Sequence, residues 1–185
     1  MGENSHIDEM LNQLHSNDLK YRQQAIDALS THNVFEIASA SLNELLIASV
    51  DSDDGMRASV AAALGKKADR GAVAVLTQRL TLDEAPKVRL RAARALGEIN
   101  DPVALPALEV AFLRGDKDLS SEAALAIRRI GNADAANILI NALSHANAFI
   151  RRSAAMQVGN LGDLTVIPTL EEALQDKEAS VSIAA

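Results

Sequence analysis

Side chains that commonly carry out chemistry are sparse in this sequence of 185 residues, and they do not cluster. There is no cysteine, which excludes thiolate ligands, disulfides and a cysteine nucleophile on this chain. The four histidines (His6, His15, His32 and His145) are scattered, and none is followed by glutamate, so they do not build a metal site. No Ser–His–Asp arrangement, glycine-rich phosphate loop or paired-carboxylate motif stands at a meaningful spacing. The sequence therefore favours a chain without catalytic residues, metal or cofactor.

Charged residues instead recur at regular intervals, in two rows of opposite sign. Arginines recur at positions 57, 89 and 151, and aspartates at positions 69, 101 and 163; these are Arg57, Arg89, Arg151, Asp69, Asp101 and Asp163. One charge of each sign per interval favours a structural ladder, in which each aspartate accepts turn amides and pairs with an arginine of the adjacent repeat. A charged ligand groove is the alternative.

The ladder breaks once. In the fourth interval Ser120 replaces the arginine, Asn132 replaces the aspartate, and Arg128 replaces a glycine. This break indicates neutral drift, although a binding site or a local change in curvature would produce the same pattern.

A second group of basic residues lies at helical spacing. Lys87, Arg91 and Arg94 stand at i, i+4 and i+7, and Arg128 with neighbouring arginines adds another cluster. A solvated outer face is the favoured interpretation, with a surface for phosphate or an acidic partner as the alternative. The net charge of −7 and the aromatic content of 2% disfavour nucleic-acid binding, because few side chains are available to stack on bases.

The elements that carry these rows repeat along the chain. The segment 88–101 recurs at 150–163, a weaker copy stands at 119–132, another precedes them at 56–69, and the most divergent begins at Tyr21. Gly65, Gly97 and Gly159 share one repeat position, and Pro106 and Pro168 share another. Agreement of several registered copies predicts a tandem-repeat architecture.

Within one copy, the apolar residues follow a helical period. Val88, Ala92, Ala93, Leu96 and Ile99 form one stripe, and the stripe continues on a returning helix after a turn at 100–102. Such a hairpin cannot bury both faces alone, so its neighbours must stack on it. The pattern predicts one all-α domain over 1–185, with hairpins at about 18–48, 54–80, 86–113, 118–144 and 148–175.

The repeat register also predicts the structure at both ends of the sequence. Residues 6–15 match a lone second helix and are expected to cap the N-terminus, and 180–185 match the start of a sixth repeat. Because solenoids usually finish on a polar cap, we expect that the chain is a fragment or that a partner covers the last face.

The run from Val88 to Leu108 closely resembles the short HEAT-like repeat named for phycobilisome lyases, and the resemblance extends over about residues 18–180. It implies a right-handed α-α superhelix, a HEAT-like solenoid of about five helical-hairpin repeats. HEAT-like deoxyhypusine hydroxylases carry repeated His–Glu pairs, and HEAT-like DNA glycosylases carry aromatic residues in basic grooves. This sequence has neither feature.

In such solenoids the second helices line the concave side, which places the remaining candidates. Val110, Leu113, Ile138 and Ile140 are expected to form an apolar patch suited to a partner helix. The other candidates for partner contact are polar or charged: Asn141, Glu171, Glu172, Arg128, Arg91 and Arg94.

The expected function is a non-catalytic scaffold that presents this concave surface to a protein partner. The resemblance implies an alternative, a subunit of an E/F-type bilin lyase or a related tetrapyrrole-handling protein. Such a protein would hold an open-chain tetrapyrrole and direct it onto a cysteine of another chain, such as a phycobiliprotein. No apolar run approaches the roughly 20 residues of a membrane span, and the polar N-terminus is not a signal peptide, so a cytoplasmic location is expected.

Overall fold

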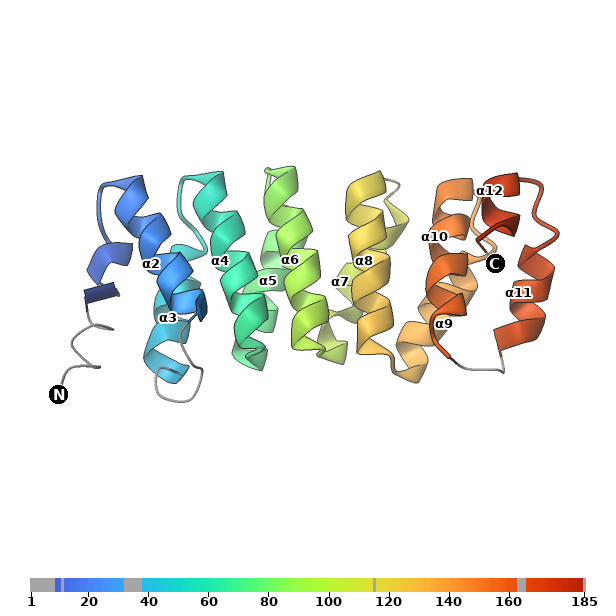
Figure 1. Ribbon diagram of the computed structural model, residues 1–185, viewed down its shortest axis with the longest axis horizontal. Coiled ribbons are helices and arrows are strands. Elements are labelled where there is room, and N and C mark those ends of the chain that lie inside the picture. Colours follow the sequence, from blue (N-terminus) through green and yellow to red (C-terminus); the bar gives the residue numbers. More distant parts are fainter. Residues whose placement is uncertain (1–8, 11, 32–37, 115, 163–165, 185) are drawn as a thin grey trace. The chain divides into compact units, whose positions relative to one another are not determined.

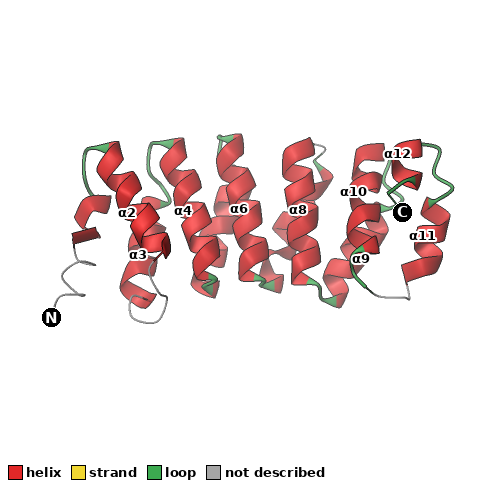
Figure 2. Cartoon of the chain, in the orientation of Figure 1, coloured by secondary structure: helices red, strands yellow, loops and turns green. Residues whose placement is uncertain are grey.

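The computed structural model describes residues 9–10, 12–31, 38–114, 116–162 and 166–184. Over these residues the chain consists of helices joined by turns and loops, with no strand (Figure 2). None of the described helices is long and apolar enough to cross a membrane. The chain divides into two compact units, residues 1–99 and 100–185, and each is described by itself.

Unit 1 is a row of parallel first helices with second helices beside them (Figure 1). Its described elements are α2 (Leu19–Thr31), α3 (Ala38–Ala48), α4 (Asp54–Lys67), the 3₁₀ turn η1 (Arg70–Ala72), α5 (Val73–Leu82) and α6 (Pro86–Ile99). Helix α4 packs against both α2 and α6, and α5 packs against α6. The first helices therefore form the layer along which successive hairpins contact each other.

Unit 2 repeats this arrangement. Its described elements are η2 (Pro102–Ala104), α7 (Leu105–Leu113), α8 (Lys117–Ile130), α9 (Ala133–Ala142), α10 (Ala148–Gly159), α11 (Ile167–Ala173) and α12 (Ala179–Ser182). Helix α8 packs against α7, α9 and α10, and α10 packs in turn against α12.

Short polar side chains fix where the helices begin. Asp53 accepts a hydrogen bond from the amide of Met56 at the start of α4, and Asp116 accepts one from Leu119 at the start of α8. These contacts satisfy amides that have no acceptor within the helix. Pro106 and Pro168 lie in the first turns of α7 and α11, as the sequence predicts, where a missing amide hydrogen costs little.

The core follows the predicted stripe. Val88, Ala92, Ala93 and Leu96 of α6 have no exposed surface, and Ile99 is 6% exposed. Helix α4 approaches α6 closely at Gly65. A Cβ built on Gly65 would lie 2.7 Å from the Cα of Ala95 and 2.8 Å from its Cβ.

Only part of the expected N-terminal cap lies within the described residues. Residues 9, 10 and 12–14 are helical, and Met10 and Leu14 are buried. Residues 6–8 and 11 lie outside the described part. At the other end, Val181 of α12 is fully buried against the unit 2 stack.

Candidate functional site

A bidentate arginine–aspartate pair recurs in the described residues of both units. Arg57 of α4 donates from Nε and Nη2 to the two carboxylate oxygens of Asp83, at 2.8 and 2.9 Å. Arg151 of α10 does the same to Asp176, at 2.6 and 2.9 Å. Arg22 of α2 pairs with Asp51, with 2.9 Å between Nε and Oδ2. In each case the arginine lies on a first helix and the aspartate in the loop that follows the second helix.

The other edge of each guanidinium holds the loop that enters its own helix. Nη1 of Arg57 donates to the carbonyl oxygens of Asp51 and Ser52, at 2.8 and 3.1 Å. Nη1 of Arg151 donates to those of His145 and Ala146, at 2.9 and 3.0 Å. We call this combination, two backbone carbonyls on one edge and a carboxylate on the other, an arginine clamp.

The clamp corrects the predicted ladder. The predicted pairing of the arginines with the aspartates at 69, 101 and 163 is wrong for Arg57 and Arg151, whose carboxylate partners are Asp83 and Asp176. Asp69 and Asp101 do accept turn amides, from Gly71 at 2.8 Å and from Val103 at 3.0 Å. Asp163 lies outside the described residues.

The sequence does carry a signal for the true partners, separate from the row at 69, 101 and 163. Asp51, Asp83 and Asp176 also stand at intervals of the repeat, each six residues before the arginine position of its own copy. Each of the three also accepts the backbone amide of the residue two positions later, which fixes the loop. In the structure each arginine pairs with the aspartate of the following copy. The repeat spacing alone does not specify this pairing.

Enclosure within the stack makes these pairs electrostatically strong. The side chains of Arg57 and Asp83 are 15% and 1% exposed. The hydrogen bond from Arg57 lowers the pKa of the Asp83 carboxyl from its ordinary value, and the hydrogen bond from Arg151 lowers the pKa of Asp176 to about 2. Both carboxylates are therefore charged at neutral pH, and they hold their loops in place.

Arg89 of α6 has only half of a clamp. Its Nη1 donates to the carbonyl oxygens of Asp83 and Glu84, at 2.8 and 2.9 Å, as in the complete clamps. Its Nε is buried and has no hydrogen-bond partner within the described residues. In the sequence, the position that matches Asp83 and Asp176 in the next copy holds Arg114, which has no acceptor group.

The fourth copy has no arginine clamp, because Ser120 stands at the arginine position. Ser120 has no exposed surface, and its hydroxyl lacks a hydrogen-bond partner among the described residues. Asn132 keeps the capping role of the aspartate that it replaces, because its side chain accepts from the amide of Ala135 at 2.9 Å.

The basic candidates lie on α6 and α8. Arg128 donates from Nε to Gln157 of α10 at 2.9 Å, which ties α8 to its neighbour. Lys87 pairs with Asp54 at 2.6 Å. Arg91 and Arg94 are exposed on α6.

The apolar candidates lie on two helices of unit 2 that contact each other, α7 and α9. Val110 is 58% exposed and Leu113 is 37% exposed, whereas Ile138 and Ile140 are half-buried. We call these four residues the α7–α9 patch. Asn141 is exposed on α9, and Glu171 and Glu172 are exposed on α11.

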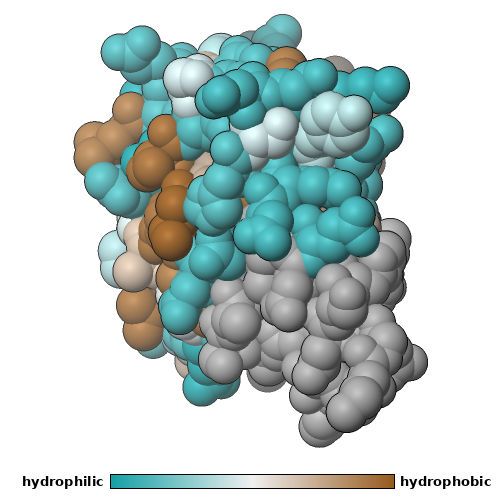
Figure 3. All heavy atoms as spheres, turned by 90° about the vertical axis from the view of Figure 1, so that its left-hand side faces the viewer, coloured by the Kyte–Doolittle hydropathy of each residue, from teal (hydrophilic) through white to brown (hydrophobic). Residues whose placement is uncertain are grey.

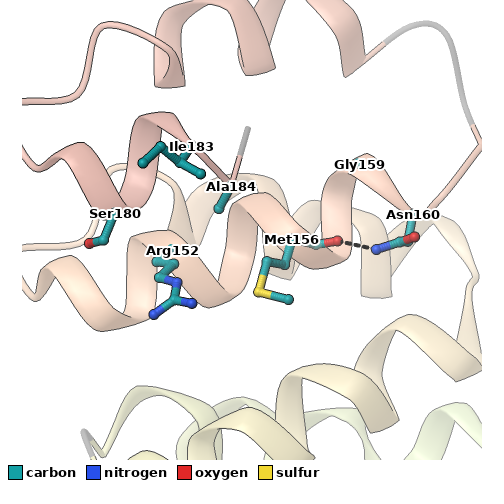
Figure 4. A pocket seen from close by; sticks show the side chains of 7 residues that line it. All are labelled: Arg152, Met156, Gly159, Asn160, Ser180, Ile183 and Ala184. Carbon is teal, nitrogen blue, oxygen red and sulfur yellow. Dashed lines mark hydrogen bonds between the residues drawn. The ribbon is translucent and has the colours of Figure 1, made fainter.

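An open cleft lies between α10 and α12 (Figure 4). Its volume is about 550 Å³, and its lining is mixed: Arg152, Met156, Gly159, Asn160, Ser180, Ile183 and Ala184. Asn160 donates to the carbonyl of Met156 at 2.6 Å at the end of α10. A Cβ built on Gly159 would meet nothing within 4 Å, in contrast to the crowded Gly65 at the same repeat position.

On the side at which α2 lies, hydrophilic side chains cover most of the described surface and hydrophobic ones gather along one edge (Figure 3). No group of three or more metal-ligating side chains occurs in the part of the chain that the structure describes. His15 contacts Glu44 at 2.9 Å, and His145 accepts the amide of Asn147, so both serve local structure.

Comparison with known proteins identifies this class of fold. The profile for HEAT repeats matches residues 42–119 and 110–185. The chain therefore belongs to the HEAT-repeat family. The predicted fold class, an all-α solenoid of helical hairpins, is confirmed, since similar solved structures are solenoids of this kind.

Two relatives narrow the repeat type. The complex of CpcE and CpcF of phycocyanin lyase from Nostoc sp. PCC7120 matches with a TM-score of 0.69 and 25% identity, over 96% of this chain and 74% of that chain. The bilin biosynthesis protein RpcF of Synechococcus sp. (strain WH8020) is 33% identical over 82 residues, 44% of this chain and 39% of that protein. The predicted resemblance to the phycobilisome-lyase repeat type is confirmed.

A third comparison concerns the fold alone. A designed armadillo repeat protein in complex with the peptide (KR)4 matches with a TM-score of 0.65 and 18% identity, over 96% of this chain and 95% of that chain. At this identity the likeness shows a shared helical-repeat architecture and nothing further about function.

Proposed function

We propose that this chain is a lyase-type HEAT module that binds an open-chain tetrapyrrole and acts with a protein partner. The observation that carries the proposal is the 25% identity to the CpcE–CpcF phycocyanin lyase complex over 96% of the chain. The 33% identity to a bilin biosynthesis protein over 82 residues supports it independently. The chain spans about two fifths of the length of that relative. The proposal therefore concerns the role of this chain and not the complete activity of the relative.

The surface of unit 2 offers a place for such a ligand. In the α7–α9 patch, Val110 and Leu113 are exposed, and Ile138 and Ile140 are half-buried on the helix that α7 contacts. Conjugated pyrrole rings are flat and largely apolar, and burying them against aliphatic side chains is favourable. In this proposal the patch takes the ring system.

The chain lacks the group that would retain a bilin covalently. It has no cysteine, so a thioether to the tetrapyrrole cannot form on it. In the proposed role the module holds the tetrapyrrole and presents it, and the acceptor thiol belongs to another chain, such as a phycobiliprotein.

The direct test is spectroscopic. Purified protein is titrated with phycocyanobilin, and the visible absorption and fluorescence of the pigment are followed. We expect a shifted and intensified visible band, because a bound bilin is held in fewer conformations than a free one. A spectrum identical to that of phycocyanobilin mixed with an unrelated helical protein would remove the bilin from the proposal.

A second candidate is a scaffold that binds only protein. The same exposed Val110 and Leu113 favour it, because apolar side chains on a repeat surface also suit a partner helix. The two candidates separate in the titration, since a scaffold leaves the pigment spectrum unchanged.

A further inference from the structure

We propose that the cleft between α10 and α12 binds a small amphipathic anion, that is, an organic molecule with one anionic group and an apolar body. The cleft lies within unit 2, because every residue that lines it belongs to that unit. The site is separate from the α7–α9 patch, since no residue of α7 or α9 lines it, and it does not depend on the proposed function.

The cleft is space that side-chain packing leaves open. A Cβ built on Gly159, at the end of α10, would meet nothing within 4 Å, although the matching Gly65 of α4 is crowded by the neighbouring helix. The cleft volume of about 550 Å³ is within the range of about 300–1,000 Å³ that is usual for small-molecule sites. A drug-sized molecule therefore fits without displacing either helix.

Apolar side chains line the cleft from both helices. Met156 of α10 is 46% exposed, and Ile183, which follows α12, is 85% exposed. The buried Val181 holds α12 against α10, so these two exposed side chains are presented from a packed pair of helices. Covering them with an apolar ligand removes their surface from water, which is favourable.

The charge of the cleft comes from one arginine. Arg152 lies four residues before Met156, so both side chains project from the same face of α10 (Figure 4). Arg152 is exposed, and within the described part of the chain it forms no ion pair, whereas the adjacent Arg151 holds Asp176. Its guanidinium is therefore within reach of a ligand and available to an anion.

The other polar groups of the lining are neutral. Asn160 donates to the carbonyl of Met156 at 2.6 Å, which fixes the amide, and Ser180 adds a hydroxyl from α12. Helix α10 has no acidic residue, and Glu178 at the start of α12 is exposed and does not line the cleft. One cation beside an apolar wall selects a ligand with one negative charge and an apolar body.

The first experiment uses two fluorescent probes that share a ring system. 1-Anilinonaphthalene-8-sulfonate carries an anionic sulfonate, and N-phenyl-1-naphthylamine has no charge. We expect Arg152→Gln to weaken binding of the sulfonate by at least about threefold and to leave the neutral probe within about 1.5-fold, because only the sulfonate contacts the guanidinium. Equal effects on both probes, or no effect on either, would overturn the assignment of an anion to Arg152.

Arg129→Gln is the matched control for that change. Arg129 is an exposed arginine of α8 in the same unit, it does not line the cleft, and its substitution removes the same charge. We expect the sulfonate to bind this variant as it binds the wild type. Equal losses in Arg129→Gln and Arg152→Gln would show a general effect of net charge and would contradict the site.

Filling the cleft tests its location. Gly159→Leu places a large side chain in open space, and Gly159→Ala adds only a methyl group at the same position. Neither should disturb packing, which thermal unfolding of both variants checks. We expect the leucine to weaken sulfonate binding by at least about tenfold and the alanine to change it by less than about twofold. Equal binding by a folded Gly159→Leu would overturn the proposal.

Methionine methyl resonances give a readout at the site itself. The chain has four methionines; Met156 lines the cleft, whereas Met10 and Met56 are buried elsewhere. With methyl-labelled methionine, we expect the sulfonate probe to shift the Met156 signal, assigned by its loss in Met156→Leu, and to leave those of Met10 and Met56 in place. A probe that fluoresces on binding without moving the Met156 signal would be bound outside the cleft and would refute the proposal.

Discussion

At the scale of single residues, the arginine at one repeat position holds two loops at once. Its Nη1 edge fixes the loop that enters a helix, and its Nε edge holds the loop that leaves the hairpin, as Arg57 and Arg151 show. Each clamp links backbone segments far apart in sequence through one side chain. Because the aspartate also accepts a loop amide, its charge contributes to the stability of the turn as well as to the ion pair.

This arrangement makes stability depend on pH in a defined window. The pKa of Asp176 is lowered by Arg151 from 3.8 to about 2, so the folded state binds its proton less readily than the unfolded state. Its contribution is complete above about pH 4 and is lost as the pH falls from there to about 2. We expect Asp176→Asn to lower the free energy of unfolding at pH 7 and to flatten its decline below pH 4, as measured by urea denaturation.

Glu171→Gln is the control for that series. Glu171 is exposed on α11, in the same unit, and the substitution removes the same charge without touching a clamp. Its unfolding curves should follow those of the wild type at each pH. If Asp176→Asn and Glu171→Gln behaved alike, the clamp would have no particular role in acid stability.

At the scale of elements, the spacing between the first helices α4 and α6 is set by small residues. Gly65 of α4 faces Ala95 of α6 so closely that no Cβ fits without movement of the backbone. Gly159 occupies the same repeat position on α10 and faces open space beside α12. One position in the repeat is therefore crowded in unit 1 and unconstrained at the cleft in unit 2.

The two glycines give a matched pair of substitutions. We expect Gly65→Ala to destabilise the protein by about 1–3 kcal/mol, because overpacking forces helices apart. Gly159→Ala should be neutral or stabilising by up to about 1 kcal/mol, because alanine is the better helix former. Chemical denaturation of both variants measures the difference. Equal effects would mean that the packing of α4 on α6 adjusts freely.

At the scale of the whole molecule, hairpins stack on their neighbours within each unit, and the second helices of unit 2 carry exposed apolar side chains. A solenoid of this kind buries one face of each second helix and leaves the other available for binding. Val110 and Leu113 of the α7–α9 patch therefore remain exposed after folding. In the proposed function this patch is the binding surface.

Substitutions on that surface separate binding from folding. Val110→Asp places a charge on the α7–α9 patch, and Val103→Asp places one on the neighbouring turn, where the side chain is 75% exposed. Both should leave thermal unfolding within a few degrees of wild type, since exposed positions contribute little to stability. We expect only Val110→Asp to weaken the phycocyanobilin band, by roughly tenfold in apparent affinity. Equal effects of the two variants would show that the ligand does not bind at the α7–α9 patch.

The sequence by itself determined the repeat, the helical hairpins and the buried stripe from Val88 to Ile99, because these depend on local period and on apolar residues that recur in register. It also marked position 89 as part of a recurrent row. It did not determine the partners of that row, since the pairing of Arg57 with Asp83 joins residues from different copies. Only tertiary structure decides which carboxylate reaches which guanidinium, because a hydrogen bond depends on ångström-scale placement that residue spacing does not specify. The two backbone carbonyls that Arg89 contacts are likewise known only from the tertiary structure.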